Sequence, residues 1–115
     1  MGYRGMVPGL AALAALCACS SAPSPATEIE KSDAMGAYQQ CLHRNAAGLD
    51  DPTTDAATIA RAITFACEAQ REDVIATASR GLPPEDQARI RRQFEQDDPP
   101  RVTLMVLQHR AGIVP

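Results

Sequence analysis

The chain has 115 residues, of which 14 are acidic and 11 are Lys or Arg, and it carries a formal net charge of −3. This length fits one small domain, and the acidic balance excludes a polycation built to neutralise nucleic-acid phosphates. With no Trp, two Tyr and two Phe, a core would contain little aromatic bulk, so covalent support would help the fold.

The first residues have the order of a secretory signal peptide. Arg4 supplies a positive charge, residues 7–16 are apolar and rich in Ala and Leu, and small residues follow at Ala18, Ser20 and Ser21. A transmembrane helix needs roughly 20 apolar residues, and this run meets Cys, Ser and Pro before that length. The pattern therefore indicates an exported chain without a permanent span here.

The end of this segment reads Leu16-Cys17-Ala18-Cys19 and resembles the lipobox of bacterial lipoproteins. The resemblance implies cleavage before Cys19 and a diacylglycerol, with palmitate-type acyl chains, on its sulfur. Cys17 departs from the small residue usual in the middle of the box. Ordinary signal-peptidase cleavage is the alternative, although Pro23 is poorly tolerated there. A metal site at Cys17 and Cys19 is disfavoured because Cys17 would leave with the signal.

The resemblance divides the chain into three parts. Residues 1–18 would be the signal peptide, and residues 19–27 would hold the acylated Cys and a Pro/Ser-rich tether. Residues 28–115 would form a small helical domain. Ser20, directly after Cys19, resembles lipoproteins sent to the outer membrane of diderm bacteria.

The two cysteines of the expected domain are Cys41 and Cys67. Export to an oxidising envelope makes a disulfide between them the default pairing. Free thiols or half of a zinc site are the alternatives, but neither a CxxC motif nor a His cluster supports them.

A first helix is predicted from Thr27 to Gly48. Thr27 and Glu30 have capping-box spacing, and Gly48 is a suitable stop. One face is mainly apolar, with residues at steps of three and four: Met35, Tyr38, Cys41 and Leu42, followed by the polar Asn45.

After a turn and cap region at 50–55, helical spacing predicts about six further turns that end at Gly81. A short connection favours an antiparallel hairpin whose stripes face each other. The positions of the two cysteines along such a hairpin do not match. At 1.5 Å per residue, Cys41 would lie about 9 Å from the turn and Cys67 about 20 Å from it.

Two short elements are predicted in the C-terminal third. Pro83 and Pro84 can open a helix over 85–96, and the sequence Asp97-Asp98-Pro99-Pro100 is expected to break it. Residues 102–107 are apolar all round, so helix and strand are not separated by periodicity; helix is preferred because no second strand is available for pairing. The expected fold is therefore all-α: a small disulfide-stapled antiparallel helical hairpin plus one or two short C-terminal helices.

Candidate catalytic and metal-binding residues are few. His43 and His109 are isolated, and no nucleophile with a partner base is visible, so neither an enzyme, a cofactor nor a metal site is predicted. Asp50, Asp51 and Asp55 suggest calcium at first, but Pro52 interrupts the required order, and solvated turn and cap charges are the preferred interpretation.

Arg89, Arg91 and Arg92 form the densest basic cluster. Helical spacing predicts ion pairs with Glu85 and Glu95 on an exposed face. Anionic lipid head groups or an acidic partner surface come second, and nucleic acid is a poor third.

The predicted function is that of a non-enzymatic, lipid-anchored envelope protein, facing the periplasm from the outer membrane and acting on an envelope partner as an adaptor or assembly accessory. Small helical lipoproteins such as secretion pilotins are similar in size, helicity and disulfide alone. The predicted contact groove comprises Tyr38, Leu42, Ile63 and Phe65. The alternatives are a small periplasmic inhibitor that uses the 48–55 loop, or a ligand-binding module; an enzyme dependent on His43 or His109 comes third.

Overall fold

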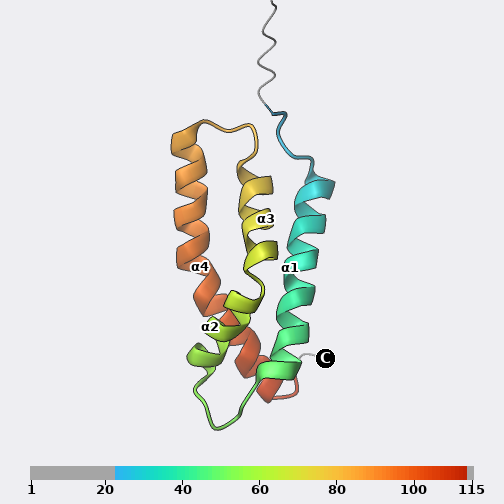
Figure 1. Cartoon of the computed structure of the whole chain (residues 1–115), viewed down its shortest axis with the longest axis vertical. Helices are drawn as coiled ribbons and strands as arrows, with labels where there is room; N and C mark the ends of the chain where they lie inside the picture. Colours follow the sequence, from blue (N-terminus) through green and yellow to red (C-terminus); the bar gives the residue numbers. More distant parts are fainter. Residues whose placement is uncertain (1–22, 114–115) are drawn as a thin grey trace, which may run out of the picture.

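The computed structural model describes residues 23–113, which fold into four helices and no strand in that range. These are α1 (Glu28–Leu49), α2 (Ala56–Ala66), α3 (Glu68–Ser79) and α4 (Pro84–Arg110). Helices α1 and α3 lie side by side and antiparallel, α4 flanks α3, and α2 lies at the end of the bundle away from the α3–α4 turn (Figure 1). The predicted all-α class is confirmed.

The first helix begins as its sequence predicts. The Thr27 side chain accepts a hydrogen bond from the Glu30 backbone N–H at 3.2 Å, and the Glu30 carboxylate accepts one from the Thr27 N–H at 2.7 Å. This reciprocal box satisfies two amide donors that would otherwise lack partners. The helix runs one residue past Gly48 and is capped by Asp50.

The predicted disulfide is confirmed. Cys41 in α1 and Cys67 at the start of α3 are joined, with an S–S length of 2.08 Å and Cα atoms 5.8 Å apart. Both cysteines lie in the core, so the bond links α1 to the junction of the next two helices.

The predicted second helix is in fact two helices, because the chain turns at Cys67. The backbone of Cys67 has φ −107° and ψ 20°, and its N–H is shared between the carbonyls of Ile63 and Thr64. The Thr64 hydroxyl also bonds the Ala60 carbonyl at 2.8 Å, a contact that tends to bend helices. The turn sets α2 across the bundle end, which brings Cys67 level with Cys41 and removes the mismatch in height.

The two short C-terminal elements are in fact one 27-residue helix, and Pro99 and Pro100 lie inside it. The carbonyls that lose a helical partner belong to Glu95 and Gln96, both on exposed residues, so water can satisfy them. Continuity keeps Phe94, Asp98, Val102 and Val106 at four-residue spacing on one face. The last two are fully buried, so core packing outweighs the helix-breaking preference of the prolines.

Residues 23–27, here called the N-terminal strap, pack against the α3–α4 turn. Arg80 Nε donates to the Ser24 carbonyl at 2.9 Å, and Ala26 is buried. Gly81 has φ +79°, and a Cβ there would lie 2.7 Å from the Pro23 carbonyl oxygen. The part of the predicted tether from Pro23 onward is therefore docked rather than free.

None of the helices between residues 23 and 113 is long and apolar enough to cross a membrane.

Candidate binding groove

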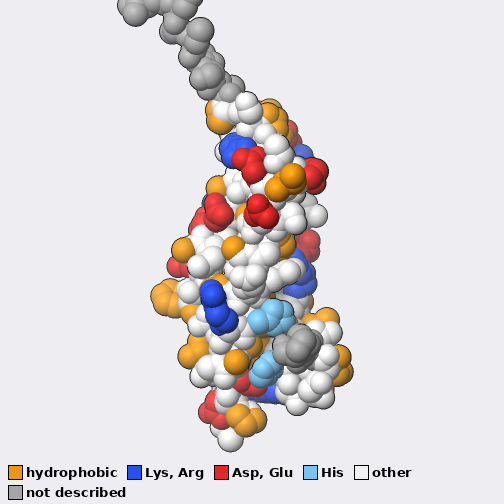
Figure 2. Space-filling view, turned by 90° about the vertical axis from the view of Figure 1, so that its right-hand side faces the viewer, with side chains coloured by type: hydrophobic (Ala, Val, Ile, Leu, Met, Phe, Trp, Pro, Cys, Tyr) orange, Lys and Arg blue, Asp and Glu red, His pale blue; other side chains and the backbone are white. Residues whose placement is uncertain are grey.

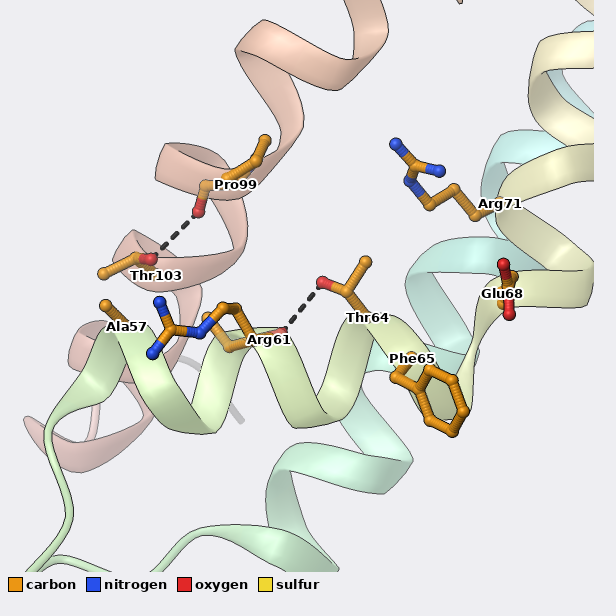
Figure 3. A pocket seen from close by; sticks show the side chains of 9 residues that line it. Ala57, Arg61, Thr64, Phe65, Glu68, Arg71, Pro99 and Thr103 are labelled. Atoms are coloured by element: carbon orange, nitrogen blue, oxygen red, sulfur yellow. Dashed lines mark hydrogen bonds between the residues drawn. The ribbon is translucent and has the colours of Figure 1, made fainter.

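A cavity of about 370 Å³ opens between α2, the start of α3 and the middle of α4 (Figure 3). We call it the α2–α4 groove. Its lining is mainly apolar or small, with three charged side chains: Ala57, Ala60, Arg61, Thr64, Phe65, Glu68, Arg71, Pro99 and Thr103. Its volume lies at the lower end of the range for small-ligand pockets.

Small side chains on α2 and Pro99 on α4 leave the groove open. Ala57 lies on the α2 side of the groove, and Pro99 and Thr103 lie on the α4 side. Ala60 is a further small lining residue. Phe65 stands at the rim, and 79% of its surface is exposed. An exposed aromatic beside an apolar hollow is typical of contact surfaces rather than of core packing.

Arg71 reaches from α3 toward α4 at one side of the groove (Figure 3). Its side chain is only 16% exposed, and its guanidinium lies 5.5 Å from the centre of the Phe94 ring. Its nearest acceptors are Asp98 Oδ2, 3.5 Å from Nε, and Glu72 Oε1, 3.5 Å from Nη1. Within residues 23–113 it donates no hydrogen bond of good geometry, and Nε is buried without a partner.

Behind the groove, Arg71 belongs to a buried polar cluster. The Tyr38 hydroxyl donates to Asp98 Oδ2 at 2.6 Å, whereas Asp98 Oδ1 is buried without a partner. Burial first, and then the bond to Asp98, raise the pKa of Tyr38 above its usual range. Tyr38 therefore stays a neutral donor, and the cluster fixes Arg71 against α4.

Sequence patterning missed Arg71 and Asp98, although a signal exists for each. Arg71 lies four residues after Cys67 and three before Val74, so it interrupts an apolar stripe. Asp98 stands between Phe94 and Val102 at four-residue spacing, which is visible only when α4 is continuous.

The four residues of the predicted contact groove do not form one. Tyr38, Leu42 and Ile63 are core residues with exposures of 0%, 5% and 0%, and only Phe65 is exposed. Tyr38, Leu42 and Ile63 pack together because the two helical stripes face each other. Phe65 lies on the opposite side of α2, where it contributes to the α2–α4 groove.

The two histidines of the sequence appear on one face of the molecule (Figure 2). His43 is half-buried beside Gln39 and Arg101, and His109 Nδ1 lies 4.0 Å from Asp50 Oδ2. No group of three or more potential metal ligands occurs among the described residues.

The acidic loop is held by hydrogen bonds to protein groups. Asp51 accepts from Thr53, and Asp55 caps α2 by accepting from Thr58; these bonds lower the pKa of both carboxyls. Asp50 accepts two hydrogen bonds from Arg110, whose guanidinium also reaches the carbonyls of Asp51 and Thr54. The three carboxylates therefore act as turn, cap and ion-pair groups.

The arginine cluster is salt-bridged with partners that differ in part from those predicted. Arg91 makes a bidentate pair with Glu72 of α3, with distances of 2.9 and 2.8 Å. Arg89 pairs with Asp86 at 2.6 Å rather than with Glu85, and the predicted Glu95 lies 4.0 Å from Arg91. The Arg91–Glu72 pair joins α4 to α3 and lowers the pKa of Glu72.

The predicted lipidation residue, Cys19, lies outside the described residues. Comparisons with protein-family models, with curated proteins and with solved structures each found no match to the chain.

Proposed function

We propose that this chain is a lipid-anchored cell-envelope protein that acts without catalysis, through contacts that the α2–α4 groove makes with an envelope partner. The groove carries the proposal, because it combines a mostly apolar hollow with the highly exposed Phe65 and with Arg71, which makes no hydrogen bond of good geometry within residues 23–113. Aromatic residues and arginine are enriched where protein interfaces gain most of their binding energy.

The proposed compartment is the periplasmic side of the outer membrane, reached through acylation of Cys19. The lipobox-like segment motivates the anchor, and the Cys41–Cys67 disulfide is compatible with an oxidising environment. Two or more acyl chains would make the attachment durable.

The N-terminal strap also suggests how the helical bundle would be oriented relative to the membrane. Since the chain from Pro23 onward packs on the α3–α4 turn, an anchor at Cys19 would hold that end of the bundle near the membrane. Helix α2 lies toward the other end (Figure 1), so the groove would face away from the lipid surface.

Site-specific photocrosslinking tests the proposal in intact cells. A photoreactive phenylalanine analogue replaces Phe65 in the full chain, expressed with its own signal segment in a diderm bacterium that naturally encodes it. A discrete crosslinked product with another envelope protein is expected. The matched control carries the analogue at Ala88, which is exposed on α4 outside the groove, and should not give that product.

A second variant distinguishes a specific contact in the groove from crosslinking by random collision. Ala57→Trp fills the groove from an exposed position, so it should suppress the Phe65 product without unfolding the domain. Equal products from both probe positions, or a product indifferent to Ala57→Trp, would contradict a groove-mediated contact.

A small periplasmic inhibitor is the second candidate function, and the 50–55 loop favours it. Arg110 fixes this exposed loop through Asp50 and two backbone carbonyls, which gives the rigidity that an inhibitory loop needs. An inhibitor would lose its target after Arg110→Ala yet keep it after Ala57→Trp. The groove-based function predicts the reverse.

A further inference from the structure

We propose that the partner segment taken by the α2–α4 groove is an amphipathic helix with an acidic side chain, whose carboxylate pairs with Arg71. This inference rests on the proposed function and specifies its partner.

The first reason lies in the hydrogen-bond and ion-pair partners of Arg71. A guanidinium has five donors, and within the described part of the chain this one makes ion pairs with Asp98 and Glu72 at 3.5 Å but no hydrogen bond of good geometry. The donor that is buried without a hydrogen-bond partner is Nε, which faces Asp98, so a ligand would pair with the remaining nitrogens. A planar guanidinium matches a carboxylate in a bidentate pair. Because Phe94 and Asp98 hold Arg71 in place, little side-chain entropy is lost when a carboxylate arrives.

The second step is charge. The rim of the groove carries two guanidiniums, Arg61 and Arg71, against one carboxylate, Glu68. Arg61 has no ion pair within residues 23–113 and bonds only the Thr58 hydroxyl, at 3.0 Å. Two more carboxylates, Asp98 and Glu72, lie 3.5 Å from Arg71, and Glu72 is also held by Arg91. The charge available at the rim is therefore mainly that of Arg61, and it favours an acidic ligand.

The third step is shape. The groove runs between two helices, and the small residues Ala57, Ala60 and Thr103 allow another backbone to approach. Apolar surface continues along α4 at Leu104 and Leu107, which are 54% and 50% exposed. Leu107 follows Thr103 by one helical turn, so an apolar helix face could extend from the groove onto it.

Selection from a phage-displayed library of helical peptides tests this inference on the purified mature protein with its disulfide intact. The selected peptides should share apolar residues three and four positions apart and one Glu or Asp. Changing that acid to its amide should weaken binding about tenfold, as expected for loss of a charge-assisted bidentate pair.

Matched variants locate the site. Ala57→Trp should weaken peptide binding at least about tenfold, whereas Ala62→Trp, exposed on α2 outside the groove, should leave it unchanged. Arg71→Gln should abolish the effect of amidating the peptide acid. Because Arg71 also supports the buried cluster, Arg61→Gln on the exposed rim provides a second test, with about a threefold loss.

Several outcomes would overturn the inference. Peptides selected without a shared acid, or bound equally by the Ala57→Trp variant, contradict it. So does laurate binding that Ala57→Trp abolishes when no peptide is selected, because the groove would then hold a fatty carboxylate. Self-association that Ala57→Trp disrupts would assign the groove to a second copy of the chain. If crosslinking at Phe65 fails but these peptides bind as expected, the proposed function fails separately.

Discussion

The buried contact between Tyr38 and Asp98 links the first helix to the last, 60 residues along the chain. Asp98 is 1% exposed, and its second oxygen has no partner in the described part of the chain. Such a carboxylate is tolerable only while its remaining contacts hold, because an unpaired buried charge is costly. The cluster therefore matters to the fold as well as to the position of Arg71.

Asp98→Asn should destabilise the domain by about 2 kcal/mol or more, because it weakens both the Tyr38 hydrogen bond and the ion pair with Arg71. Urea unfolding of the oxidised protein measures the loss. Asp97→Asn, one residue earlier and exposed, is the matched control and should change stability by less than about 0.5 kcal/mol. Equal effects of the two changes would contradict a structural role for the buried pair.

The Tyr38 hydroxyl should lose its proton at a higher pH in the folded protein than in the unfolded chain. Its pKa is raised in the native protein by burial and by Asp98, so the native state holds the phenolic proton more tightly than the unfolded chain does. The resulting stabilisation is complete below about pH 10 and decreases as pH rises toward the native pKa. In protein prepared without residues 1–18, Tyr38 is the only tyrosine, so tyrosinate absorbance reports it alone.

We expect this absorbance to rise only well above pH 10 in the native protein, together with loss of helical circular dichroism. In concentrated guanidinium chloride it should rise at about pH 10. Tyr38→Phe should remove this part of the alkaline destabilisation. A native titration that matches the denatured one would contradict the burial of the hydroxyl.

At this scale, the pairing of Cys41 with Cys67 could be predicted from the sequence, because they are the two cysteines of the expected domain and the predicted export favours a disulfide. Phe65 was assigned to one groove with Tyr38, Leu42 and Ile63, but those three residues are buried, whereas Phe65 is exposed on the opposite side of α2. The helical spacing does not distinguish the side of α2 that meets α1 from the side that faces α4 until the turn at Cys67 is known.

Among the elements, the disulfide and the strap act on opposite parts of the bundle. The Cys41–Cys67 bond closes a loop of 26 residues, for which chain entropy gives about 3–4 kcal/mol. The strap relies on non-covalent contacts at the α3–α4 turn, where Gly81 supplies a left-handed backbone that other residues adopt with strain.

Gly81→Ala should destabilise the oxidised domain by about 2 kcal/mol or more, since the added Cβ meets both the positive φ and the Pro23 carbonyl oxygen. Gly112→Ala has a similar φ of +70° but no atom within 4 Å, so it should cost only about 1 kcal/mol. Thermal and urea unfolding compare the two variants. Equal losses would mean that the strap contributes nothing at Gly81.

Helix α1 and its capping box could be predicted because their signals are local. The division of the predicted second helix at Cys67 and the continuity of α4 could not be predicted in this way. In the first case the disulfide and the crossing of α2 decide the backbone turn, and in the second the burial of Asp98, Val102 and Val106 outweighs two prolines. Both differences arise from contacts between residues far apart in sequence. The groove was missed for the same reason, because it exists only where α2 crosses α4.

For the whole molecule, the strap predicts a fixed orientation on a membrane. Single cysteines for fluorescent labels replace two exposed helical alanines, Ala88 near the α3–α4 turn and Ala47 near the far end of α1. In vesicles carrying the acylated protein, energy transfer to a lipid dye should be stronger from position 88 than from position 47.

Gly81→Val should reduce this difference, because it displaces the strap and frees more chain between the anchor and the bundle. Acylated protein with equal transfer from both positions would contradict the orientation while leaving the anchor intact. Absence of the protein from vesicles would count against the anchor itself.

Mass spectrometry of the exported protein, taken intact from membranes, tests the central claim most directly. The account predicts a chain that begins at Cys19, carries diacylglycerol and acyl chains on that residue, and has the mass of an oxidised Cys41–Cys67 pair. An unmodified start at Ala22, Pro23 or Thr27, or a mass higher by two hydrogens from free thiols, would contradict it.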